Sequence, residues 1–342
     1  MMEKKMETSS FATSLKIGED LSLNSIDLQK LIRDAKSIAI LSHIRPDGDT
    51  IGGALSMYEV CKNLGQNPVI LCESKIPEYL SFVPNTNDYK QETYDKFELV
   101  FAIDCADLAR VGNLQTIFEQ ANITVNIDHH QGNSNFAKYN LVERELSSTC
   151  QVLYGLYKRN NINISKQIAQ YLYTGLSTDT GNFMHSTVSR EVFLMAADLA
   201  DIGVDIPFIN RNLYQQSSRQ RLKLIACALR KLEYHCLDRV TVIQINMTDL
   251  EECGISPSET EGIASYCINI KGVLVGSIMT QIEPTVYKVS FRSHPGVDVS
   301  LVANKFGGGG HKQAAGCLVT GTPQEAYEKV VRAMTDLIDC TV

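Results

Sequence analysis

The chain has 342 residues, of which 44% are hydrophobic and 21% are charged. These fractions exclude wholesale disorder, collagen and a small disulfide scaffold, and the length fits two domains of ordinary size. The formal net charge is −7. An acidic chain is a poor candidate for gripping long duplex nucleic acid, because that binding mode needs a surplus of lysine and arginine.

Cysteine usage and hydropathy point to a cytoplasmic protein. The ten cysteines are scattered and form no C-x-x-C pair, which is typical of unpaired, small apolar residues in a reducing compartment. Residues 1–22 contain no apolar run that resembles a signal peptide. No stretch approaches the ~18 apolar residues that a membrane-spanning helix requires. We therefore expect no association with membranes.

Short apolar runs alternate with helical stretches in the first half of the chain. Each run leads into a polar or glycine-containing loop, which argues against the alternative reading as buried helical segments. This alternation predicts an α/β, Rossmann-like domain with a parallel sheet and helices on both faces. The expected strands cover residues 37–41, 67–72, 97–104 and 122–128, and the expected helices cover 51–65, 147–160, 165–177 and 188–202.

The pattern changes after residue 204. Residues 205–229 are polar and helical and predict a connecting helix, and the chain then becomes rich in strands. A smaller α+β domain with a mixed sheet is therefore expected over the remaining residues. Its strands are expected at 239–246, 272–282 and 285–293, with a turn at Glu283-Pro284, and its last helix at 322–338.

The segment SHIRPDGDTIGG (42–53) directly follows the first predicted strand. Ligands of open parallel sheets bind at the carboxyl ends of the strands, so His43, Asp47 and Asp49 would lie at the right place. One imidazole and two carboxylates suit a divalent cation such as manganese. Taken alone, Asp and Gly could equally populate a turn.

Further acids and histidines follow two other predicted strands and one helix. Asp104 ends the third strand, Asp128-His129-His130 ends the fourth, and Asp179 follows a helix. Carboxylates that converge at one sheet edge repel one another unless cations neutralise them. A pair of metal ions that share a carboxylate is an arrangement used for phosphoryl displacement. The motif set therefore favours a two-metal site over unrelated turns and caps.

These motifs together resemble a known family. The pattern H-x-x-P-D-G-D (43–49), the acid of AIDCAD (Asp104), the Asp-His-His triplet (128–130) and D-T-G (179–181) resemble, in order and spacing, the motifs of the DHH phosphoesterase superfamily. The segments FRS (291–293) and GGGGHKQAAG (307–316) resemble the DHH-associated C-terminal domain. The two-domain layout is most similar to the bacterial oligoribonucleases that degrade nano-RNA and also dephosphorylate 3′-phosphoadenosine 5′-phosphate (pAp).

The resemblance implies a division of the chain into four parts. These are an N-terminal extension (1–24), a DHH metal-binding phosphoesterase domain (25–204), a helical linker (205–229) and a DHH-associated, substrate-binding domain (230–342). Members of the family are commonly dimers through the first domain, so a homodimer is expected.

The resemblance also implies a role for each acid and histidine of the first domain. Two divalent cations would be bound, with Mn²⁺ expected and Mg²⁺ or Co²⁺ as alternatives. Asp104 would bridge the cations, and Asp128 would orient a histidine ring. His130 would face the substrate phosphate as a hydrogen-bond donor or proton carrier, which makes Asp104 and His130 the expected catalytic residues. The remaining ligands would be His43 and Asp47 for one cation and Asp49, His129 and Asp179 for the other.

In the second domain, the glycine run 307–310 and the adjacent His311 are candidates for substrate binding. Backbone N–H groups of such a run can approach an anion, although a glycine run taken alone is more often only a flexible loop. The resemblance favours substrate contacts by Gly308, Gly309, Gly310 and His311, and a bidentate phosphate contact by Arg292. Ser148 and Thr149 are read as helix caps without a chemical role.

The leading hypothesis is a phosphoesterase that hydrolyses short single-stranded RNA to mononucleotides and converts pAp to AMP. A cyclic-dinucleotide (or pApA) phosphodiesterase is the nearest alternative. An inorganic pyrophosphatase is less well supported, because such enzymes depend on lysines of the second domain. A nucleotide sensor without catalysis is disfavoured because every metal position of the motif set is filled.

Overall fold

The computed structural model describes residues 27–260 and 262–339, without the side chains of residues 258 and 259. The predicted extension, residues 1–24, lies outside the described residues. The chain divides into two compact units between Gln216 and Ser217, and this boundary falls within the stretch 205–229.

The first unit is built on a five-stranded sheet in the order β2-β1-β3-β4-β5, and all of its strand pairs are parallel. The four expected strands are present, which confirms the predicted parallel sheet. The fifth strand was not predicted, because its sequence YNLV is short and half polar. The strands are β1 (Ile38–Ser42), β2 (Val69–Leu71), β3 (Leu99–Ile103), β4 (Ile123–Asp128) and β5 (Tyr139–Val142).

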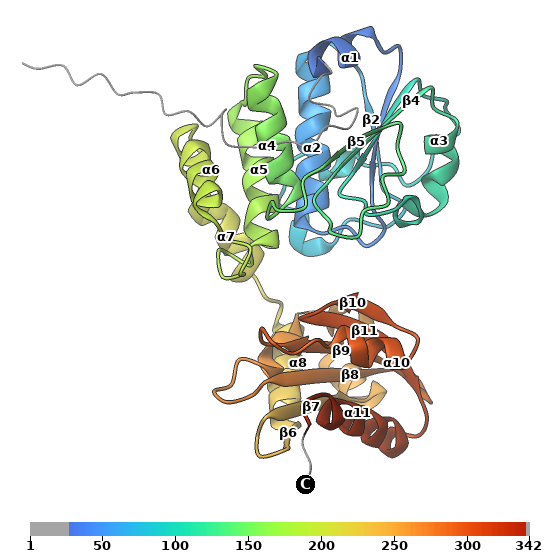
Figure 1. Ribbon diagram of the computed structural model, residues 1–342, viewed down its shortest axis with the longest axis vertical. Helices are drawn as coiled ribbons and strands as arrows, with labels where there is room; N and C mark the ends of the chain where they lie inside the picture. Colours follow the sequence, from blue (N-terminus) through green and yellow to red (C-terminus); the bar gives the residue numbers. More distant parts are fainter. Residues whose placement is uncertain (1–26, 261, 340–342) are drawn as a thin grey trace, which may run out of the picture. The chain divides into compact units, whose positions relative to one another are not determined.

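Helices cover both faces of this sheet, as predicted (Figure 1). The side chains of β1 are apolar on both faces of the sheet, and each face needs a cover. Ile38 and Ile40 belong to one apolar cluster, and Ala39 and Leu41 belong to another. The first cluster includes residues of α1 (Leu28–Asp34), α2 (Gly48–Asn63), α4 (Thr149–Arg159), α5 (Lys166–Asp179) and α6 (Arg190–Asp201). The second includes residues of the 3-10 helix η5 (Leu108–Leu114) and α3 (Gln115–Glu119). Two short 3-10 helices, η3 (Glu78–Leu80) and η4 (Thr86–Asp88), follow β2.

The expected connecting helix over 205–229 is in fact two helices, α7 (Ile206–Tyr214) and α8 (Arg219–Arg230). The break has a local cause, because the Ser218 hydroxyl accepts a hydrogen bond from the N–H of Arg221 and starts a new helix. Helix α7 packs against α5 of the first unit, and α8 packs against α9 (Met247–Cys253) of the second.

The second unit contains a six-stranded mixed sheet in the order β10-β11-β9-β8-β7-β6. Only the β7–β8 pair is parallel, which confirms the predicted mixed sheet. Apolar clusters lie on both of its faces. Its remaining elements are β6 (Leu232–His235), β7 (Val240–Ile245), η6 (Pro257–Thr260), η7 (Ile263–Cys267), β8 (Val275–Glu283), β9 (Val286–Ser293), α10 (Ser300–Lys305), β10 (Gly309–His311), β11 (Ala314–Thr320) and α11 (Pro323–Leu337).

Within residues 27–260 and 262–339, eight cysteines are free thiols, and seven of these are buried. Cys236 is disulfide-bonded, so the expectation of unpaired cysteines is wrong at that position. Among the residues that the structure describes, no helix combines the length and hydropathy needed to cross a membrane.

Candidate metal centre

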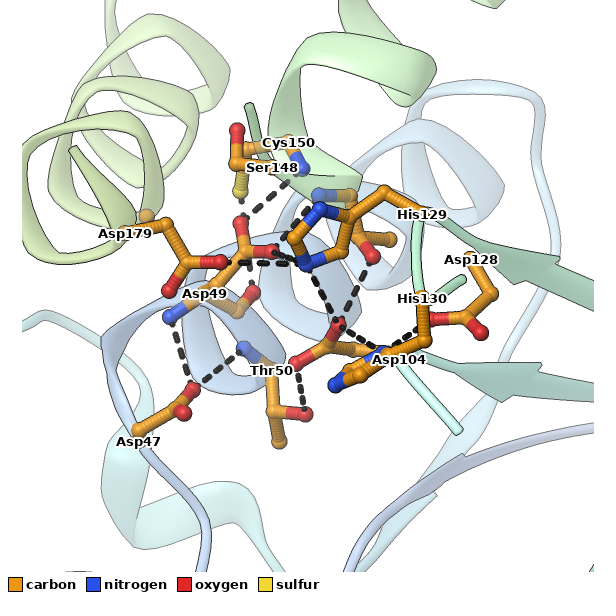
Figure 2. Close-up of polar contacts among 12 residues, drawn as sticks. Asp47, Asp49, Thr50, Asp104, Asp128, His129, His130, Ser148, Cys150 and Asp179 are labelled. Carbon is orange, nitrogen blue, oxygen red and sulfur yellow. Dashed lines mark hydrogen bonds and ion pairs between the residues drawn. The ribbon is translucent and has the colours of Figure 1, made fainter. Parts of the chain in front are cut away.

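The acids and histidines expected at the sheet edge lie together in the structure. His43 follows β1, Asp104 follows β3, and Asp128 is the last residue of β4. Asp179 reaches the same place from the last turn of α5. Figure 2 shows the labelled acids and histidines pointing toward one another. Parallel strands place their carboxyl ends at one edge, so residues far apart in the sequence meet there.

The possible ligand atoms form two main groups, within each of which they lie within 4.8 Å of one another. The first group contains His43, Asp47 and Asp104, and the second contains Asp49, His129 and Asp179. The division between groups is the one expected from the sequence, but which residues bind a cation stays a prediction.

Asp104 lies between the two groups. Its Oδ2 is 3.5 Å from Nε2 of His43, and its Oδ1 is 3.8 Å from Nε2 of His129. The two oxygens of one carboxylate therefore face different groups. Asp104 also forms a third group with His129 and His130. Its φ of 61° is in the left-handed region, which non-glycine residues seldom occupy and which often marks functional sites.

Both histidines of the main groups present Nε2 to the carboxylates. Nδ1 of His43 is 2.8 Å from the carbonyl oxygen of Ile44, and Nδ1 of His129 is 3.2 Å from that of Leu146. An Nδ1–H that donates to a backbone carbonyl fixes the ring and leaves Nε2 as a ligand, which is the usual arrangement of metal-bound imidazoles. The donor set therefore fits divalent cations.

Asp47 and Asp49 are placed by the start of α2. Oδ1 of Asp47 accepts the N–H groups of Asp49 and Thr50, each at 3.1 Å, and so caps the helix. The Asp47 side chain is 49% exposed, whereas Asp49 is fully buried. The site is therefore open to solvent on the side of Asp47 and closed behind Asp49.

The N-terminus of α4 holds the buried carboxylate of Asp49. The N–H of Thr149 donates to Oδ2 at 2.6 Å, and the N–H of Cys150 donates to Oδ1 at 2.9 Å. Free N–H groups at a helix start stabilise an anion. No local pattern predicts this contact, because about 100 residues separate its partners.

Two threonine hydroxyls bind the carboxylate of Asp104. Thr50 donates to Oδ2 at 2.9 Å, and Thr149 donates to Oδ1 at 2.8 Å. Ser148 is the N-cap of α4, as expected, since its Oγ accepts the N–H of Gln151 at 3.0 Å. Thr149 has more than the capping role expected from the sequence, because it contacts two of the acids at the centre of the site.

Glycines allow α2 and α5 to pack closely enough to bring Asp49 beside Asp179. A β-carbon on Gly48 would lie 2.4 Å from Cγ2 of Thr178, and one on Gly52 would lie 2.4 Å from the carbonyl oxygen of Tyr171. Larger side chains would separate the two helices and the acids that they carry.

Burial and mutual charge shift the pKa values of the acids and histidines. Burial lowers the pKa of His43, but the hydrogen bond and charge of Asp104 outweigh it and raise that pKa to about 9. The pKa of His129 is raised to about 10, because Asp179 and Asp49 outweigh the effect of burial. Burial raises the pKa of Asp179 to about 7. In the metal-free protein, bound protons therefore offset the negative charge that divalent cations would otherwise neutralise.

Asp128 holds the ring of His130 rather than that of His129. Its Oδ1 is 2.7 Å from Nδ1 of His130, and its Oδ2 accepts the amide of Asn133 at 2.5 Å. The same amide donates to Oδ1 of Asn126 at 2.8 Å. Asn126 and Asn133 are buried and were not predicted from the sequence, although both lie within seven residues of the Asp-His-His triplet.

Two of the candidate substrate residues of the second unit, Arg292 and His311, share one row of its sheet. Ala314 of β11 pairs with Arg292 on one side and with His311 on the other. Paired residues of antiparallel strands point to the same face, so Arg292 and His311 flank a small side chain on that face. Their role in substrate binding stays a prediction.

The glycine run is an edge strand and the turn before it, rather than a loop without regular structure. Gly309, Gly310 and His311 form β10. A β-carbon on Gly308 would lie 2.1 Å from the carbonyl oxygen of Gly316, and Gly310 has a φ of +146°. Strand packing therefore accounts for glycine at these two positions, whereas Gly309 has nothing nearer than 3.8 Å from its absent β-carbon.

Comparison with known proteins agrees with this architecture. Residues 37–176 match the DHH family, N-terminal domain, and residues 239–339 match the DHHA1 domain. The chain is 29% identical to the bifunctional oligoribonuclease and PAP phosphatase NrnA of Thermus thermophilus, covering 87% of this chain and 89% of that protein. It is 25% identical to the cyclic-di-AMP phosphodiesterase PdeA of Listeria monocytogenes, covering 90% of this chain and 48% of PdeA.

Among solved structures, an exopolyphosphatase-related protein from Bacteroides fragilis matches with a TM-score of 0.85 and 25% identity, covering 90% of this chain and 94% of that one. The two successive domain matches and the curated relatives lead to one conclusion. The chain is a phosphoesterase of the DHH family, in which a DHH domain is followed by a DHHA1 domain.

Proposed function

We propose that this protein is a two-metal, Mn²⁺-dependent hydrolase that degrades RNA oligonucleotides of a few nucleotides to mononucleotides and dephosphorylates pAp to AMP. The observation that carries the proposal is the pair of ligand groups that meet at Asp104. The name of the Thermus thermophilus relative, a bifunctional oligoribonuclease and PAP phosphatase, supports this choice of substrates.

Within the proposal, His43 and Asp47 hold one cation, Asp49, His129 and Asp179 hold the other, and Asp104 contacts both. Such a pair of cations would polarise the phosphoryl oxygens and lower the pKa of a water that attacks phosphorus. Each acid would act in its ionised form, held in place by its neighbours. Asp104 is suited to this role because His43, His129 and His130 outweigh its burial and hold its pKa well below the usual range.

His130 is the proposed proton carrier. Burial lowers its pKa, but the hydrogen bond to Asp128 and the charge of Asp104 outweigh burial and raise the pKa above its ordinary value. The charged form therefore persists to a higher pH than in a free imidazole, and Asp128 keeps Nδ1 occupied. Nε2 is then the atom that donates a hydrogen bond or a proton to the substrate.

The charge of the chain supports short substrates. The net charge of −7 provides no surplus of basic residues to follow a long phosphate backbone. Activity should therefore fall as RNA lengthens beyond a few nucleotides, and blunt duplexes should not be attacked.

A substrate panel tests the proposal. The purified full-length chain with Mn²⁺ is assayed against dinucleotide RNA, pAp, pyrophosphate, pApA and cyclic di-AMP, with Asp104→Asn as the control for contaminating activity. We expect turnover of dinucleotides and pAp, and a loss of at least about a hundredfold in the variant. A variant within tenfold of wild type would correspond to only ~1.4 kcal/mol of barrier, which is too little for a bridging ligand and would overturn the assignment.

A cyclic-dinucleotide phosphodiesterase is the second candidate, because the chain is also similar to PdeA. It would be favoured if cyclic di-AMP or pApA were hydrolysed with a higher kcat/KM than dinucleotides and pAp. Binding of these nucleotides without turnover would instead indicate a sensor.

A further inference from the structure

Thr149, the first residue of α4, contacts two acids that belong to different ligand groups. Its N–H donates to Oδ2 of Asp49 at 2.6 Å, and its hydroxyl donates to Oδ1 of Asp104 at 2.8 Å. Its side chain is fully buried. Thr149 therefore links the carboxylate of Asp49 to that of Asp104, which lies between the two ligand groups.

The helix itself does not need the hydroxyl of Thr149. Capping of α4 is already provided by Ser148, whose Oγ accepts the N–H of Gln151. The Thr149 hydroxyl instead points to a carboxylate that is 3% exposed. A role in helix formation therefore accounts for the serine but not for the threonine beside it.

The hydroxyl acts on one particular oxygen of Asp104. Oδ1 is the oxygen that faces His129, whereas Oδ2 faces His43 and accepts the hydroxyl of Thr50. A carboxylate oxygen offers two lone-pair sites. With one of them occupied by a threonine hydroxyl, the direction of the other is fixed, and it is left for a cation.

We propose that Thr149 is a positioning residue for the cation pair: its N–H and hydroxyl set the placement of Asp49 relative to Asp104 and so determine how tightly the cation on the His129 side binds. This inference rests on the proposed two-metal function. Thr149 would act through the two carboxylates, without contacting the metal or the substrate itself.

Thr149→Val tests the proposal, because valine removes the hydroxyl but keeps the shape of the side chain and the backbone N–H to Asp49. The readout is the Mn²⁺ binding isotherm of the full-length protein by calorimetry, together with the electron paramagnetic resonance signal of the Mn²⁺ pair. Removing such a supporting contact typically weakens metal affinity by about 10- to 100-fold. We expect one of two Mn²⁺ sites to weaken by that factor and the pair signal to diminish accordingly.

Two further variants separate positioning from a merely structural effect. Thr149→Ser retains the hydroxyl and should restore both Mn²⁺ sites to within about threefold of wild type, inside the tenfold lower bound for losing the contact. Thr174→Val is the matched control, because Thr174 is also buried and its hydroxyl donates to a backbone carbonyl of its own helix, that of Gln170, at 2.9 Å. It should leave the isotherm unchanged.

The outcomes distinguish this inference from the proposed function. Wild-type protein that binds fewer than two Mn²⁺ ions would refute the two-metal function on which the inference rests. Wild-type protein that binds two, together with an unchanged isotherm for Thr149→Val, would refute the role of Thr149 alone. Failure of Thr149→Ser to restore binding would do the same. Thermal unfolding of each variant shows that the isotherms belong to folded protein.

Discussion

Gly175 of α5 lies directly against Asp49 of α2. A β-carbon at position 175 would lie 2.6 Å from Oδ1 of Asp49 and 2.3 Å from Sγ of Cys150. Both contacts are shorter than real β-carbons tolerate, and both neighbours are fully buried. The absence of a side chain at residue 175 therefore sets the position of a carboxylate that is proposed to bind metal.

Gly175→Ala should displace Asp49 and lower both activity and stability. A misplacement of ~1 Å in a catalytic constellation can cost about a hundredfold in rate, and overpacking a core typically costs ~1–3 kcal/mol. We expect losses of these sizes in kcat/KM on pAp and in the free energy of unfolding, together with weaker Mn²⁺ binding.

Gly155→Ala provides the matched control in α4. Its new β-carbon would meet only the end of the flexible Arg159 side chain, at 3.3 Å. Alanine is favoured over glycine inside a helix by roughly 0.5–1 kcal/mol, so this variant should be slightly more stable and fully active. Equal losses in the two variants would show that the contact with Asp49 has no special importance.

Asn133→Ala should impair catalysis without changing metal binding. The amide of Asn133 donates to Oδ2 of Asp128, whose other oxygen holds the ring of His130. Without it, the buried Asp128 loses a donor and the His130 ring loses its fixed orientation. We expect kcat on pAp to fall by about 10- to 100-fold while KM and the Mn²⁺ isotherm stay near wild type. A changed isotherm would place His130 among the metal ligands instead.

The acids at the strand ends can be predicted from the sequence, but the residues that fix the position of these acids cannot. Asp104 directly follows an apolar strand and Asp128 ends one. An acid at the end of an apolar run can be recognised from the sequence without a structure. The contacts of Thr149 and Gly175 are not visible, because their partners at residue 49 are 100 and 126 positions away in the sequence. Helix packing, which no local pattern encodes, brings them together.

The same limit applies to the edges of the two sheets. The strands β5 and β10 are short. Half of the residues of β5 are polar and β10 consists of two glycines and a histidine, so both lack the apolar pattern that predicts the central strands. Each of these two strands is instead defined by its pairing with a neighbour, β5 with β4 and β10 with β11. The glycine run of β10 therefore reads as a loop in the sequence, although it pairs in register with β11.

Binding of Mn²⁺ should release protons and strengthen as pH rises. The metal-free pKa values of His43 and His129 are raised to about 9 and about 10, so both rings are charged at neutral pH and must lose a proton to bind a cation. One proton displaced per site gives an increase of about tenfold in affinity per pH unit up to pH ~9. Calorimetry in buffers of different ionisation enthalpy measures the protons released, and a count near zero would contradict the charged imidazoles.

The stability of the metal-free protein should fall as pH rises, whereas the affinity for Mn²⁺ increases. A folded-state pKa of His43 that is raised from 6.5 to about 9 contributes stability below pH ~6.5, and this contribution is lost as pH rises through ~9. The Tm of chelator-treated protein should therefore fall over this range, and Mn²⁺ should remove the fall. His43→Ala should flatten part of the slope.

Arg292→Ala should raise KM for pAp and leave metal binding unchanged. The planar guanidinium can make two parallel hydrogen bonds to a phosphate, and hydrogen bonds to charged groups contribute ~1.5–3 kcal/mol, which corresponds to roughly 10- to 150-fold in KM.

Lys288→Ala is the control, since Lys288 lies four residues earlier on β9 and therefore on the same face. It removes the same unit charge but should change KM by less than about threefold, because a charge that makes no direct contact with the substrate is screened. Equal effects of the two variants would mean that Arg292 acts only through the overall positive charge near it and not through a direct contact with the phosphate. A shift of the Mn²⁺ isotherm in Arg292→Ala would contradict the assignment of metal binding to the first unit and of substrate binding to the second.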